Sequence, residues 1–223
     1  VELLEEERRK NLNYKYDEKK LVIQLDKEYS RAESYTIKIQ YTARPGLVQA
    51  GGSWAIRSNQ GLYFINARSD NPQIWTQGET QSNSAWFPTI DSPNQNMSQE
   101  IILTVDQKYT TLSNGLLISS LLNEDGTRTD HWKQEKPHAP YLAMIAVGKF
   151  EIIKDYWRDM PVYVYAEEED LEKAKGLFKK TYKMIDYFSE KLDYEYPWDK
   201  YHQIVVRNFV SGAMENTGAV VFG

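Results

Sequence analysis

Hydrophobic and polar residues alternate over segments 21–29 and 33–43. Further strand candidates follow at short intervals, at 62–67, 100–106, 115–122, 128–134, 141–147, 149–156 and 162–166. A period of two is typical of strands that bury one face. Turn signals such as Ser113–Gly115 and Glu124–Gly126 separate these short segments. The pattern therefore predicts an antiparallel sheet assembly, a β sandwich or saddle.

The period changes at Glu167. Apolar residues then recur at spacings of three, four or seven, as at Leu171, Ala174 and Phe178, which predicts one amphipathic helix over 167–192. A continuous apolar run at 202–210 is typical of a buried strand. We therefore expect a mainly β fold with an α/β C-terminal part. The predicted N-terminal β domain covers 1–157, and the beginning of a second domain, cut off before it is complete, covers 158–223.

The net charge and the absence of cysteine exclude several classes of function. The formal net charge is −5 and no cysteine is present. Nucleic-acid binding needs a surplus of Lys and Arg on some face, so we expect no nucleic-acid partner. Thiolate metal sites, disulfides and cysteine nucleophiles are excluded. No stretch approaches the roughly 20 apolar residues of a membrane-spanning helix, and the charged first ten residues do not fit a signal peptide.

Histidine and serine patterns point to no catalytic site. His131, His138 and His202 lack the spacing of four that puts two zinc ligands on one helix face, so we interpret them as structural or surface residues. No G-x-S-x-G segment marks a serine nucleophile. The glycine-rich segment 46–53 lacks the spacing and the lysine of a phosphate loop, which leaves an ordinary loop over 44–53.

Two carboxylates remain as candidates. Glu79 follows a strand-like segment and precedes small polar residues, which is equally typical of a solvated loop. Glu215 lies in "GAMENTG", among residues small enough for another backbone to approach closely. This segment is either an ordinary glycine-rich turn or an edge strand that pairs with an extended peptide, with a Glu beside the peptide's cationic amine.

Several blocks of the sequence resemble one enzyme family. "GAMEN" (Gly212–Asn216) resembles the exopeptidase signature of the aminopeptidase N family, the gluzincin zinc aminopeptidases, which also includes leukotriene hydrolase. The other blocks follow in the expected order: "TQGE" (76–79), "FPTIDSP" (87–93), "SNG" (113–115), "PYLAMIAVGKFE" (140–151) and "YPWDKYHQIVV" (196–206). The resemblance covers residues 14–223. Thr89 stands where the family usually has Cys, which we interpret as a packing substitution.

The resemblance implies a role for each residue of the two blocks that carry an acid. Glu215 and Glu79 bind the free α-amine of a peptide substrate. Gly212 and Ala213 supply backbone groups along the substrate, Met214 lies along the same edge, and Asn216 holds the loop. The implied fold is a β saddle domain followed by the start of a thermolysin-like catalytic domain.

The resemblance also implies zinc in the parent protein. The family's H-E-x-x-H zinc motif lies downstream of "GAMEN" and does not occur before Gly223, so we expect no metal site and no hydrolysis in this chain alone. The parent is expected to remove N-terminal residues from peptides with a free N-terminus. Two alternatives stay open: an epoxide hydrolase like leukotriene hydrolase, and a non-catalytic family member that acts as a β-sandwich binding or scaffold module.

Overall fold

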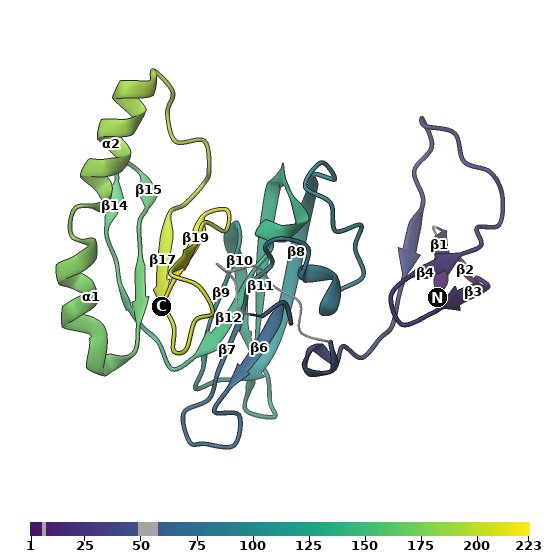
Figure 1. Cartoon of the computed structure of the whole chain (residues 1–223), viewed down its shortest axis with the longest axis horizontal. Coiled ribbons are helices and arrows are strands. Elements are labelled where there is room, and N and C mark those ends of the chain that lie inside the picture. Colours follow the sequence, from purple (N-terminus) through teal and green to yellow (C-terminus); the bar gives the residue numbers. More distant parts are fainter. Residues whose placement is uncertain (6–7, 49–57) are drawn as a thin grey trace. The chain divides into compact units, whose positions relative to one another are not determined.

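A computed structural model describes residues 1–5, 8–48 and 58–223 (Figure 1). Contacts between Cα atoms divide the chain into two compact units, Val1–Ala43 and Arg44–Gly223, which are described separately. This division differs from the boundary at 157/158, which stays a prediction. In the loop predicted over 44–53, Pro45–Leu47 forms a single 3₁₀ turn, and residues 49–53 lie outside the described residues.

The first unit contains short strands. Its three-stranded sheet has the order β2-β1-β5, and β3 pairs with β4 in a separate hairpin. The bounds are β1 (Glu2–Glu5), β2 (Arg8–Asn11), β3 (Tyr14–Tyr16), β4 (Leu21–Ile23) and β5 (Thr36–Lys38). The strands predicted over 21–29 and 33–43 are thus too long. Between β4 and β5, Tyr29 donates to Asp26 at 2.9 Å and the Ser30 amide donates to Glu33 at 2.9 Å. Such local bonds compete with a strand ladder.

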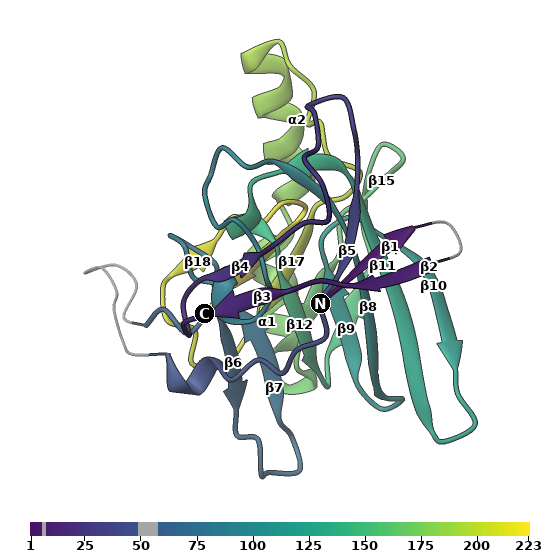
Figure 2. The same ribbon diagram turned by 90° about the vertical axis from the view of Figure 1, so that its right-hand side faces the viewer.

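Two antiparallel sheets form the β part of the second unit, and their strands can be followed in Figure 2. One has the order β6-β7-β12-β9 and the other β10-β11-β8. The bounds are β6 (Leu62–Ile65), β7 (Gln73–Thr76), β8 (Met97–Asp106), β9 (Thr110–Ser113), β10 (Leu116–Leu122), β11 (Thr127–His138) and β12 (Ile145–Gly148). Exposure alternates at every residue of β8, as its period-two sequence predicts.

The C-terminal part contains a five-stranded mixed sheet with the order β13-β16-β17-β19-β18. Its bounds are β13 (Glu151–Ile153), β16 (Val164–Ala166), β17 (His202–Val205), β18 (Ala213–Met214) and β19 (Ala219–Phe222), and a small hairpin joins β14 (Tyr156–Trp157) to β15 (Met160–Pro161). The central pairs β16–β17 and β17–β19 are parallel, whereas the edge pairs are antiparallel. The prediction of a mainly β fold with an α/β C-terminal part is confirmed.

Two helices replace the single helix predicted over 167–192. They are α1 (Leu171–Phe178) and α2 (Thr181–Leu192), with a break at Lys179 and Lys180. The helices bury different partners: Ala174 of α1 packs with Val164 and Ala166, and Ile185 of α2 packs with Trp157 and Val162. The break lets each apolar face meet its own partner, which one straight helix would not do. Among the described residues, no helix is long and apolar enough to cross a membrane.

One hydrophobic core joins the sheets of the second unit. It contains Trp75 of β7, Leu112 of β9, Trp132 of β11, Ile204 of β17 and Met214 of β18, together with further buried residues of β6, β12, β16, β19 and the loops between strands. Because these side chains pack in one cluster, the antiparallel sheets and the mixed sheet are held at a fixed spacing. That spacing positions the loops at the ends of β7 and β18, where the candidate acids lie.

Candidate amine-recognition site

Glu79 lies on a tightly held loop directly after β7. The Gln77 amide donates to the Gly61 carbonyl at 2.9 Å, and the Ser82 amide donates to the Gly78 carbonyl at 2.8 Å. A Cβ atom at Gly78 would lie 2.2 Å from the Tyr141 carbonyl oxygen, so only glycine fits at this close approach. The Glu79 side chain is half-buried. The loop therefore presents Glu79 from a backbone that has little freedom to move.

Glu215 follows β18, the edge strand of the mixed sheet. β18 pairs with β19 through Ala213 opposite Phe222 and Met214 opposite Val221. Exposure alternates along the segment: Ala213 and Glu215 are exposed, whereas Met214 and Asn216 are each 1% exposed. This is the period of a strand with one buried face. Glu215 and the backbone at Gly212 thus face outward, as a substrate-binding edge would require.

A buried side-chain contact connects the two segments. Gln77 Nε2 donates to Met214 Sδ at 3.3 Å, and both side chains are 1% exposed. Gln77 precedes Glu79 by two residues, and Met214 is the neighbour of Glu215. The structure therefore brings together the segments that carry both predicted acids, although they are far apart in the sequence.

Residues that the sequence reasoning missed hold the other flank of Glu215. Asn114 Nδ2 donates to the Thr217 carbonyl at 2.9 Å, while Asn114 Oδ1 accepts from the Met144 amide at 2.7 Å. His138 Nδ1 lies 2.9 Å from the Thr217 hydroxyl. Asn114 lies in "SNG", which the sequence pattern explains as a turn, so only the resemblance of this block to the family could have drawn attention to Asn114. Gln77 likewise lies inside "TQGE".

Asn216 contributes its backbone to this flank. Its carbonyl accepts from the Ala219 amide at 3.0 Å, which closes the turn between β18 and β19. Its side chain is 1% exposed, and neither amide atom has a partner among the described residues. The buried side chain does not lie on the exposed edge with Glu215. A role in holding the loop fits this placement and stays a prediction.

The three histidines lie in different surroundings. Burial lowers the pKa of His138 to about 4. His202 stacks on Tyr163 with ring centroids 4.6 Å apart, and burial, followed by the charge of Lys200, holds its pKa well below the usual range. His131 Nε2 lies 2.8 Å from Glu100. Within residues 1–5, 8–48 and 58–223, no group of three His, Cys, Asp or Glu side chains could hold a metal ion.

Comparison with known protein families shows which family the chain belongs to. Residues 2–142 match the peptidase M1 N-terminal domain, and residues 177–223 match the peptidase family M1 domain. The chain belongs to the peptidase M1 family. The resemblance to the aminopeptidase N family that the sequence blocks carry is thereby confirmed.

Curated M1 relatives cover most of this chain. The puromycin-sensitive aminopeptidase of Caenorhabditis elegans is 29% identical over 84% of the chain, the human glutamyl aminopeptidase 28% over 87%, and aminopeptidase N of Streptomyces lividans 26% over 73%. The aligned regions are 21%, 22% and 19% of these relatives, respectively. The chain thus spans about a fifth of the length of the curated relatives it matches.

The M1 matches assign the two acids to different domains of the family. Glu79 lies within the match to the M1 N-terminal domain, and Glu215 lies within the match to the M1 domain. The contact between Gln77 and Met214 therefore joins the two M1 domains beside the candidate site. The interval between the matches, 143–176, contains the predicted boundary at 157/158.

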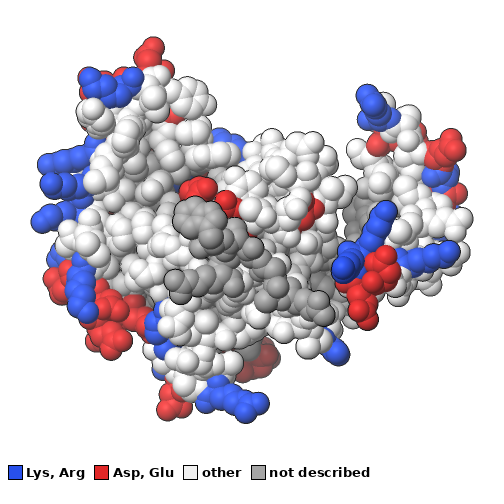
Figure 3. Space-filling model, viewed as in Figure 1, with Lys and Arg blue, Asp and Glu red and all other residues white. Residues whose placement is uncertain are grey.

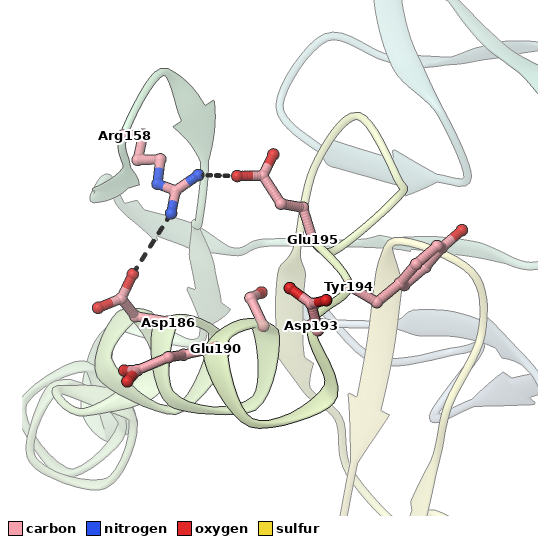
Figure 4. A pocket seen from close by; sticks show the side chains of 7 residues that line it. Arg158, Asp186, Glu190, Asp193, Tyr194 and Glu195 are labelled. Atoms are coloured by element: carbon pink, nitrogen blue, oxygen red, sulfur yellow. Dashed lines mark hydrogen bonds and ion pairs between the residues drawn. The ribbon is translucent and has the colours of Figure 1, made fainter.

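A separate hollow of about 330 Å³ lies at the C-terminal end of α2 and does not include Glu79 or Glu215. Four acids line it together with Arg158, which contacts Glu195 and lies 3.8 Å from Asp186 (Figure 4). In Figure 3, positive and negative side chains are interspersed along the two helices. The arginine already has acidic partners, so this hollow offers no unpaired cation to a ligand.

Proposed function

We propose that this chain is the substrate-amine recognition part of a zinc metalloaminopeptidase, in which Glu79 and Glu215 together bind the free α-amine of a peptide. The longer protein would hydrolyse N-terminal residues from peptides. The observation that carries this proposal is the buried contact between Gln77 and Met214, because it brings the two acid-bearing segments together.

The chemistry of the two acids suits an ammonium group. A peptide's α-ammonium is a cation with three N–H donors, and carboxylates accept charge-assisted hydrogen bonds that are about twice as strong as neutral ones. Acetylation of the amine removes the charge and leaves the two carboxylates to repel each other without a cation between them. A pair of acids therefore distinguishes a free N-terminus from a blocked one.

The edge of β18 suits the peptide backbone. β18 lies at the end of the strand order, so among the described strands it has a neighbour on one side only. Extended peptides add to such an edge through main-chain hydrogen bonds. Ala213 and Gly212 are exposed there, and a Cβ at Gly212 would meet nothing within 4 Å. A peptide that pairs with this edge would place its first residue beside Glu215.

Hydrolysis itself requires groups beyond those described. In zinc peptidases the metal polarises the scissile carbonyl and activates water. The described residues offer no ligand set for zinc, so we assign no step of the reaction to them. We place zinc and catalysis in the longer protein and amine recognition in this chain. A purely scaffolding role has no observation in its favour.

The test compares a free and a blocked peptide. We would titrate the 223-residue chain with trialanine and with N-acetyl-trialanine and follow amide shifts by NMR. We expect the acetylated peptide to bind at least about tenfold more weakly, since tenfold corresponds to about 1.4 kcal/mol. Glu215→Gln should remove this difference, whereas Glu190→Gln, an exposed acid on α2, should keep it. Equal binding of both peptides by the unaltered chain would refute amine recognition.

A further inference from the structure

We propose that Arg207 is a positioning residue for the amine site: it anchors the segment that leads to Glu215 onto the strand that leads to Glu79. This inference rests on the proposed function of the two acids. Arg207 does not touch the peptide. It acts through contacts with β7 and with the end of β16, which hold the chain between β17 and β18 in place.

Both backbone groups of Arg207 are held by side chains of β7. The Arg207 amide donates to Gln73 Oε1 at 2.9 Å, and the Arg207 carbonyl accepts from Trp75 Nε1 at 3.1 Å. Gln73 is 1% exposed and Trp75 is 0% exposed. Side chains in a close-packed interior have little room to move, so the position of β7 fixes the backbone at residue 207. β7 continues directly into the loop of Glu79.

The guanidinium of Arg207 adds a charged contact to a different strand. Its Nε lies 3.0 Å from Glu167 Oε2, and its Nη2 donates to the Asn71 carbonyl. Asn71 Nδ2 donates to the other carboxylate oxygen of Glu167, which closes a ring of three residues. Glu167 directly follows β16 and is 7% exposed, so water screens this ion pair less than it screens a surface pair. Arg207 therefore joins the turn before β7 to the end of β16.

Arg207 lies where the chain turns from β17 toward β18. Asn208 has a φ of 56°, a left-handed conformation that Asn adopts more readily than most residues. Phe209 then packs edge to face on Trp75, with ring centroids 5.1 Å apart. β18 itself pairs with β19 through two residues only, and so short a strand has little stability of its own. The anchored segment that begins at Arg207 therefore decides much of where β18 and Glu215 lie.

The contacts of Arg207 also run from one M1 domain to the other. Its partners at the start of β7 lie within the match to the M1 N-terminal domain, whereas Arg207 lies within the match to the M1 domain. Arginine suits such a junction, because its planar fork offers donors in several fixed directions, whereas lysine offers a flexible point charge. One side chain thus ties together the segments that carry the two acids.

The experiment removes the guanidinium and measures recognition of the amine. Arg207→Gln is made in the 223-residue chain, which is titrated with trialanine and with N-acetyl-trialanine and followed by NMR. We expect about a fivefold loss of discrimination between the peptides and shifted amide signals at Gly212–Asn216, since residues that contact no ligand can still change binding severalfold. Arg158→Gln is the matched control, because Arg158 also pairs with acids, Asp186 and Glu195, in the separate hollow beside α2. It should leave both measurements unchanged.

A further variant separates positioning from a general loss of stability. Ile185→Val weakens the cluster that α2 buries, so it should lower the urea midpoint of unfolding and keep the discrimination between the peptides. If Ile185→Val loses as much discrimination as Arg207→Gln, the effect of Arg207 is one of stability and the proposal is overturned. Should Arg207→Gln not fold, Arg207→Lys keeps the charge and loses the fork. Unchanged discrimination and unchanged amide signals in Arg207→Lys would then overturn the role of Arg207.

A double-mutant cycle tests whether Arg207 acts through Glu167. Glu167→Gln removes the charge of the carboxylate and leaves the backbone contacts of Arg207 in place. If the two residues act through their mutual contact, the variant that carries both substitutions should lose no more discrimination than Arg207→Gln alone. Additive losses would overturn the assignment of the ion pair to this role.

The outcomes separate this inference from the proposed function. If the unaltered chain discriminates between the peptides and Arg207→Gln discriminates equally well, the positioning role is overturned and amine recognition stands. Unchanged amide signals at Gly212–Asn216 in Arg207→Gln overturn the positioning role without reference to any peptide. If the unaltered chain does not discriminate, amine recognition fails, and the functional part of this inference fails with it.

Discussion

His138 should make the stability of the chain fall as the pH is lowered. The imidazole is 3% exposed and lies between Thr217 and Gln99. Gln99 Nε2 donates to Asn114, so Gln99 Oε1 accepts from His138 Nε2, and His138 Nδ1 accepts from the Thr217 hydroxyl. The neutral imidazole therefore makes hydrogen bonds to both Thr217 and Gln99. Lowering the pH protonates this ring, and the substitution His138→Asn removes it.

The sign and size follow from the pKa in the two states. Burial lowers the pKa of His138 from 6.5 to about 4 in the folded chain. The unfolded state therefore binds a proton first as the pH falls, and the stability that is present above pH 6.5 is lost toward pH 4. The full difference of about 2.5 pH units corresponds to about 3 kcal/mol, of which about 2 kcal/mol is lost between pH 7 and pH 5.

Urea unfolding at pH 7 and pH 5 measures this effect. The unaltered chain should lose about 2 kcal/mol more than His138→Asn over this interval. His202 is also buried with a lowered pKa, but it is present in both proteins and cancels in the comparison. His131→Gln is the control, because it leaves the burial of His138 intact. An equal loss in the unaltered chain and in His138→Asn would refute the reasoning.

Two further predictions concern the residues that support the site. Gly78→Ala should destabilise the chain by about 1–3 kcal/mol, because the new Cβ would lie 2.2 Å from the Tyr141 carbonyl oxygen. Gly176→Ala in α1 is the control: its Cβ would meet nothing within 4 Å, so it should stabilise the chain by about 0.5–1 kcal/mol. Urea unfolding of both variants measures the two free-energy changes. Lys200, 1% exposed and 4.2 Å from the Trp132 ring centroid, has a pKa well below 10.5 because it is buried. The free energy of unfolding should therefore rise between pH 7 and pH 9 more in the unaltered chain than in Lys200→Met, and equal slopes would contradict this.

The sequence predicted the fold best where one face of a strand is buried. In β8 the strand predicted over 100–106 is observed, and apart from Ile102, which is 65% exposed, its apolar residues lie on the more buried face. The helix was predicted less well, because nothing at Lys179 or Lys180 signals an end. The break depends on two separate packing partners, Val164 for α1 and Trp157 for α2, and periodicity within one segment does not reveal such partners.

The candidate site was predicted as residue types and not as contacts. Glu79 and Glu215 could be given a role only through the resemblance of "TQGE" and "GAMEN" to one family, because the local pattern alone fitted a solvated loop and a glycine-rich turn equally well. The contact between Gln77 and Met214 could not be predicted, since a glutamine and a methionine carry no sign of pairing when they lie in different domains. The same holds for Asn114 and Thr217, which meet only because the core sets the spacing of their sheets.

A shared core would let two domains supply the proposed amine site. The attraction between a carboxylate and an ammonium falls with distance, from about 4 kcal/mol at 4 Å to about half of that at 8 Å for an effective dielectric constant of 20. A pair of acids therefore binds an ammonium group strongly only if both carboxylates stay within a few ångströms of it. The same buried cluster contains Trp75 and Met214. Trp75 lies on the strand that leads to Glu79, and Met214 is the neighbour of Glu215. Trp75 also donates to the Arg207 carbonyl at 3.1 Å, on the segment that leads to β18. Because packed cores deform little, these contacts fix the separation of the two acids without requiring the acids to touch each other.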